Sequence, residues 1–170
     1  MACFEDFVIC EAQPLYWRLL SWYCLVRIWG TMRFDDHRGL LPSSMRMVSG
    51  SLRGTLVRTK TSGAGKKREE LYLHIDASAY FFHPSWLRVG WDLWHALGTQ
   101  RDYFLMVPSS DFNGVIQLEA LYSDSQACSR RLLHRLSHTD GTSLLDVEGS
   151  GAFWTEHGDR ATLPSLAACM

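Results

Sequence analysis

A mainly α-helical domain with a small antiparallel sheet formed by one β-hairpin is the fold class that this sequence predicts. Apolar residues recur at helical spacing in three long stretches, 15–29, 84–98 and 116–136. Only the stretch 45–75 changes to the alternation that is typical of extended strands. With 170 residues, 46% of them hydrophobic, the chain is long enough for one domain with a sizeable core and short for two.

The first long helix is predicted to be buried. Its apolar residues run from Leu15 to Trp29 after Pro14, which suits a first helical turn, and the pattern stops at Gly30. Two arginines interrupt the stretch, so it lacks the run of about 20 apolar residues that a membrane span requires. We therefore expect a core helix and no membrane partner.

A second, short helix is predicted over 31–40. It places Arg33 and Asp36 three residues apart on one face, and Pro42 ends it. Because an adjacent carboxylate can hold a guanidinium in one rotamer, Asp36 is expected to orient Arg33. The alternative is an ordinary ion pair on a helix surface, which contributes little to stability.

The stretch 45–75 is predicted to form the β-hairpin. Leu52 and Leu56 share one face of its first strand. The connection 61–66 reads Thr-Ser-Gly-Ala-Gly-Lys and is rich in turn formers, which places Lys60 at the mouth of the hairpin. The second strand has a matching apolar face formed by Leu71, Leu73 and Ile75.

The rest of the chain is predicted to alternate between helices and loops. An amphipathic helix is expected over 84–98 and a loop over 106–114. Another helix is expected over 116–136, with a break near Ser123 as an alternative. The polar, glycine-containing stretch 139–151 is expected to be a flexible connection.

Charge points to DNA only through local clusters, because the net charge is -1 and the sequence pI is about 6.6. The first cluster contains no acid and consists of Arg53, Arg58, Lys60, Lys66, Lys67 and Arg68. The second consists of Arg130, Arg131, His134 and Arg135. The alternative for either cluster is a solvated face without a partner.

The cysteines indicate a reducing compartment. Their number, five, is odd, and no two form a Cys-x-x-Cys pair, so neither a disulfide framework nor a zinc site is expected. We therefore expect the protein in the nucleus or the cytoplasm.

Four side chains stand in an order suited to phosphate chemistry. Arg33 comes first, Lys60 follows, and His157 and Arg160 form a His-x-x-Arg box. A guanidinium offers a planar fork to two phosphate oxygens, a lysine is both charge partner and acid, and an imidazole moves protons. These are the groups that a protein needs to grip one phosphodiester and move protons on and off its oxygens.

The order and surroundings of these residues resemble the catalytic domain of tyrosine recombinases, the phage-integrase superfamily. The segment 29–36 reads Trp-Gly-Thr-Met-Arg-Phe-Asp-Asp, as in integrase-like proteins of mobile elements. Asp36 takes the place of the acid that follows the family's first arginine by three residues. On this resemblance, 29–170 is an incomplete catalytic domain and 1–28 is a helical segment packed on it.

The resemblance also implies roles. Arg33 and Arg160 would clamp the non-bridging phosphate oxygens, and His157 would help to accept the proton of the nucleophile. Lys60 would protonate the leaving oxygen, with Lys66 and Lys67 as alternative holders of that role. The implied partner is double-stranded DNA, no metal or other cofactor is needed, and a homo-oligomer on DNA is left open. The implied DNA contacts are Arg53, Arg58, Lys66, Lys67 and Arg68.

The nucleophile of that family is a tyrosine that lies beyond the His-x-x-Arg box. All six tyrosines of this chain precede His157. We therefore expect a chain truncated before the nucleophile, which does not break DNA by the family mechanism on its own. The alternative is a non-catalytic remnant that binds DNA or another protein.

Overall fold

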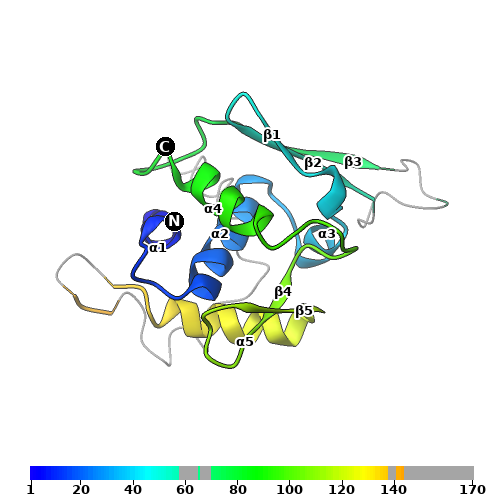
Figure 1. Cartoon of the computed structure of the whole chain (residues 1–170). Helices are drawn as coiled ribbons and strands as arrows, with labels where there is room; N and C mark the ends of the chain where they lie inside the picture. Colours follow the sequence, from blue (N-terminus) through cyan, green and yellow to red (C-terminus); the bar gives the residue numbers. More distant parts are fainter. Residues whose placement is uncertain (58–64, 66–69, 138–140, 144–170) are drawn as a thin grey trace.

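A buried helix, α2 (Leu15–Trp29), lies at the centre of the protein (Figure 1). The structure is a computed structural model that describes residues 1–57, 65, 70–137 and 141–143. Around α2 pack α1 (Ala2–Ile9), α4 (Trp86–His95) and α5 (Tyr122–Leu133). The predicted core helix at 15–29 is therefore confirmed, and its burial explains why it is apolar on nearly all sides.

The remaining elements are short. A five-residue helix α3 (Phe34–Arg38) and a 3-10 turn η1 (Pro42–Ser44) follow α2. The strands are β1 (Arg46–Val48), β2 (Ser51–Leu56), β3 (Leu71–Ile75), β4 (Met106–Pro108) and β5 (Val115–Glu119).

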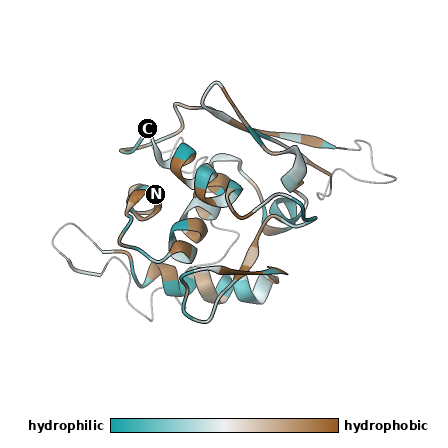
Figure 2. Ribbon diagram, viewed as in Figure 1, coloured by the Kyte–Doolittle hydropathy of each residue, from teal (hydrophilic) through white to brown (hydrophobic). Residues whose placement is uncertain are grey.

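Strands β1, β2 and β3 form an antiparallel sheet in that order, which confirms the predicted hairpin. From Leu52 to Leu56 and along β3, buried residues alternate with more exposed ones, so one face packs on the core and the other is open. Figure 2 shows the hydropathy of the residues changing along these strands. Gly54 lies on the packed face, where a Cβ would be 2.5 Å from Met45 Sδ and 3.0 Å from Leu40 Cδ1. A side chain at this position would therefore displace the Met45 side chain, which favours glycine in the middle of the strand.

The fold is a mixture of helices and strands, and the prediction of a mainly α-helical domain is wrong. Helices make up 41% and strands 19% of the described residues. The difference comes from β4 and β5, a second antiparallel hairpin in the stretches predicted as a loop over 106–114 and a helix over 116–136. Its turn is closed because Gly114 donates its N–H to Ser109 Oγ at 2.9 Å.

Helix α5 begins six residues later than the predicted helix. The carboxylate of Asp124 accepts the Leu121 N–H at 2.9 Å and thereby caps the first turn at Tyr122. Helix α4 falls within the predicted stretch 84–98, and α1 falls within the stretch 1–28 that was expected to be helical, whereas β1 was not predicted. No helix in the described part of the chain is long and apolar enough to cross a membrane.

Helix α3 contains a buried histidine, His37, which is 2% exposed. Within the described part of the chain, neither of its ring nitrogens has a hydrogen-bond partner. Its ring lies 4.6 Å from that of Phe104 and 6.0 Å from that of Tyr23, measured between centroids. Burial, and to a lesser extent the positive charge of Arg27, holds the pKa of His37 well below its usual 6.5.

This burial predicts a loss of stability in acid. The unfolded chain takes up a proton at His37 as the pH falls through about 6.5, whereas the folded chain does not until a lower pH. The free energy of unfolding should therefore fall below pH 6.5 by up to about 1.4 kcal/mol per pH unit from this group. Urea denaturation at several pH values measures the free energy of unfolding. His37→Leu should flatten the dependence, while His95→Gln, at an exposed position in α4, should not; equal slopes in all three proteins would contradict the prediction.

Candidate nucleic-acid interface

Two of the residues predicted to act on DNA lie in the described part of the chain, namely Arg33 and Arg53. The other predicted site residues lie outside the described residues: Arg58, Lys60, Lys66, Lys67, Arg68, His157 and Arg160. Convergence of Arg33 with His157 and Arg160 therefore stays a prediction.

Arg33 is the residue just before α3 rather than part of that helix. Its backbone N–H donates to Asp36 Oδ2 at 3.0 Å, so the carboxylate closes the first turn of α3 through the backbone. Just upstream, Thr31 has a φ of 49°, a left-handed conformation that is strained for a β-branched residue. The Met32 N–H completes this turn by donating to the Arg27 carbonyl at 2.9 Å. The backbone at Arg33 is thus held from both sides.

Contacts along α3 fix where Arg33 lies. The ring of Phe34 packs edge-on against Tyr122, with centroids 5.2 Å apart, and Arg38 Nε donates to Glu119 Oε1 at 2.7 Å. At the other end of the helix, the Gly39 carbonyl accepts the N–H of Val57 at 3.0 Å. Helix α3 is therefore joined to the end of β2, where the chain enters the stretch 58–64.

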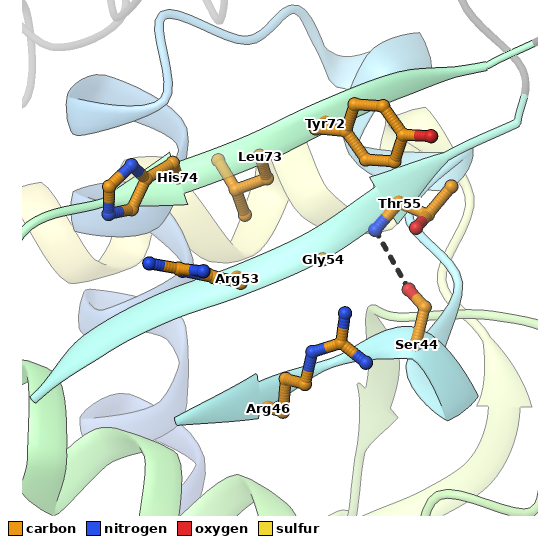
Figure 3. Close-up of a pocket in the computed structure, with 8 residues that line it drawn as sticks. All are labelled: Ser44, Arg46, Arg53, Gly54, Thr55, Tyr72, Leu73 and His74. Carbon is orange, nitrogen blue, oxygen red and sulfur yellow. Dashed lines mark hydrogen bonds between the residues drawn. The ribbon is translucent and has the colours of Figure 1, made fainter. Parts of the chain in front are cut away.

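Three basic side chains form a row across the open face of the sheet. The strand register places Arg46 opposite Arg53, and Arg53 opposite His74. All three are exposed, and Figure 3 shows them on three adjacent strands. Of the three, the sequence predicted Arg53 as a DNA contact and missed the other two.

The row borders a shallow hollow of about 380 Å³. Its lining residues are Ser44, Arg46, Arg53, Gly54, Thr55, Tyr72, Leu73 and His74 (Figure 3). The Thr55 N–H donates to Ser44 Oγ at 2.8 Å, and the Ser44 hydroxyl donates to the Leu41 carbonyl at 2.8 Å. These two bonds tie η1 to β2 and hold that side of the hollow in place.

The row brings two positive charges, those of Arg46 and Arg53, together on one face of the sheet. Like charges directly opposite each other on neighbouring strands destabilise a sheet. In the described part of the chain, no carboxylate forms a salt bridge with Arg46 or Arg53. The nearby Asp76 is held by Ser78, whose hydrogen bonds lower the pKa of that carboxyl, and His74 contributes a smaller part. Two guanidinium groups are therefore left to bind an anion, and phosphate matches their geometry.

The second basic cluster does not extend this surface. Its residues lie in the C-terminal half of α5 and just after it, and Figure 1 shows α5 on the opposite side of α2 and α4 from the sheet. The Arg135 guanidinium lies 4.9 Å from the centroid of the Trp17 ring, a cation–π contact. Among the described residues, no group of three or more His, Cys, Asp or Glu side chains is placed to hold a metal ion.

Comparison with known proteins supports the fold and nothing finer. No protein-family model matches the chain, and no curated protein matches it. Among solved structures, the FLP recombinase in its complex with a Holliday junction superposes with a TM-score of 0.56 at 12% sequence identity. The superposition covers 98% of this chain and 39% of the recombinase chain. The protein therefore has a recombinase-like fold, and it spans about two fifths of the length of that recombinase.

Proposed function

We propose that this protein binds double-stranded DNA through the open face of the sheet β1–β3. The observation that carries the proposal is the row formed by Arg46, Arg53 and His74, placed on a fold similar to that of a recombinase. The like charges of Arg46 and Arg53, opposite each other on β1 and β2, cost stability, so their presence on an exposed face is accounted for by an anionic partner. Duplex DNA, with its closely spaced phosphates, is the partner that the fold favours.

Such binding is expected to depend on salt and little on base sequence. Guanidinium contacts to phosphates position a protein on the duplex without reading the bases. Neutralising each phosphate releases counterions, so affinity falls as the salt concentration rises. Because the net charge of the chain is -1, the attraction to DNA depends on local basic surfaces such as this one.

The proposal also includes a larger site, formed by Arg33, Lys60, His157 and Arg160, with the chemistry of tyrosine recombinases. Arg33 would bind a non-bridging oxygen of the phosphate together with Arg160, while His157 and Lys60 would transfer protons. The position of α3 beside the end of β2 supports this, because Lys60 follows that strand by four residues. For these 170 residues the function proposed is DNA binding.

The test removes the two guanidinium groups and measures affinity and stability together. For the double variant Arg46→Thr, Arg53→Thr, affinity for a duplex should fall at least about tenfold, because each charge-assisted bond contributes about 1.5–3 kcal/mol. The slope of log K against log salt should become shallower by about 1.8, which corresponds to two phosphates. Stability should rise by about 0.2–1 kcal/mol, since the repulsion between strands is removed. Fluorescence anisotropy and urea denaturation measure the two effects.

A matched control is the double variant Arg88→Gln, Arg131→Gln. It removes the same charge from exposed positions on α4 and α5, away from the sheet. The proposal fails if the control weakens DNA binding as much as the sheet variant, or if the sheet variant binds like the original chain.

A further inference from the structure

An unpaired aromatic ring stands beside the basic row on the open face of the sheet. Tyr72 is 73% exposed, lies opposite Thr55 and points to the same side as His74, two residues along β3 (Figure 3). Its hydroxyl donates to Glu70 Oε1 at 2.5 Å. In the described part of the chain, no other aromatic ring packs against it. The ring is therefore anchored at its hydroxyl while its faces stay open to solvent.

The spacing of the two rows matches the parts of one nucleotide. The row of Thr55 and Tyr72 and the row of Arg53 and His74 are two residues apart along the strands, which is about 6.6 Å. A base resting on the Tyr72 ring would bring its own or the adjoining phosphate toward the row of Arg53 and His74, where Figure 3 shows the Arg53 guanidinium turned toward His74. The hollow of about 380 Å³ between them is of the size that small-ligand sites have.

We propose that this face binds single-stranded DNA, with one base stacked on Tyr72 and the flanking phosphates held by Arg46, Arg53 and His74. The base must come from a single strand, because in a duplex each base is covered on both sides by its neighbours and offers no face to the ring. Sheets that present exposed aromatic and basic residues bind single strands in this way, and such stacking tolerates any base. Arg46, Arg53 and His74 would contribute to both this site and the proposed duplex site, whereas Tyr72 would contact only single-stranded DNA.

The experiment compares three chains with two probes. The probes are fluorescein-labelled oligo(dT) of about 12 nucleotides and a duplex of the same length, at about 50 mM salt. Tyr72→Leu should lower the affinity for oligo(dT) about tenfold and change the affinity for the duplex less than twofold. Tyr72→Phe keeps the ring and should bind both probes like the original chain. Because Tyr72 is exposed, both variants are expected to fold, and urea denaturation checks this.

The outcomes separate this inference from the proposed duplex binding. Unchanged binding of oligo(dT) by Tyr72→Leu, or an equal loss for both probes, would overturn the role of the ring. Binding of the duplex without any binding of oligo(dT) would also overturn it and leave duplex binding standing. Binding of oligo(dT) that depends on Tyr72, without duplex binding, would support this inference and overturn only the proposed function.

Discussion

Gly90→Ala is expected to destabilise the protein by about 2 kcal/mol, although alanine is the better helix former. Gly90 is buried in the middle of α4 where that helix crosses α2, and an added Cβ would overlap the indole ring of Trp22. That ring cannot retreat, since it is fully buried and its centroid lies 5.7 Å from that of Phe104 and 5.9 Å from that of Trp94. Overpacking therefore outweighs the gain of about 1 kcal/mol in helix propensity.

A double variant tests whether overlap with the Trp22 indole causes the loss of stability in Gly90→Ala. Trp22→Leu alone leaves a cavity and should destabilise the chain, but it makes room for the alanine. The loss for Gly90→Ala with Trp22→Leu should accordingly be smaller than the sum of the two single losses, measured by urea denaturation. Additive losses would show that Gly90 is needed for another reason.

The elements predicted correctly are those whose own residues determine them. Helix α2 is buried on nearly all sides, so its long apolar run identifies it, and the hairpin of β2 and β3 has turn formers between two alternating strands. The hairpin of β4 and β5 was missed because its strands have only three and five residues. The alternation from Ile116 to Glu119 is too short to distinguish a strand from the start of the helix that follows.

Only part of the candidate interface could be predicted from the sequence, because strand pairing brings its residues together. Arg53 was found by counting positive charges along the chain. Arg46 joins it through pairing between strands, and His74 is 21 residues away in sequence. Pairing partners are set by register and not by local pattern, and the short strand β1 gives too few residues for a period to show. The exposure of the Tyr72 ring likewise depends on the fold and has no local signal in the sequence.

The most consequential contact without a signal in the sequence is made by Glu5. The side chain is fully buried, and its carboxylate accepts three successive backbone N–H groups, from Phe81 at 2.8 Å, Phe82 at 2.8 Å and His83 at 3.0 Å. Its partners are backbone groups more than 70 residues away, so no pattern of side chains in the sequence predicts the contact. The contact ties α1 to the segment that precedes α4.

Glu5→Ala should destabilise the protein by about 3–5 kcal/mol, because it leaves three N–H groups without an acceptor and each costs about 1–3 kcal/mol, partly relieved by water. Asp6→Asn is the matched control: that carboxylate is 60% exposed and pairs with His83 at 2.6 Å, so its removal should cost less than about 1 kcal/mol. Urea denaturation should show one transition at a lower midpoint with an unchanged slope. A separate early transition would instead mean that α1 detaches while the rest of the protein stays folded, and an unchanged midpoint would mean that the three N–H groups find other acceptors.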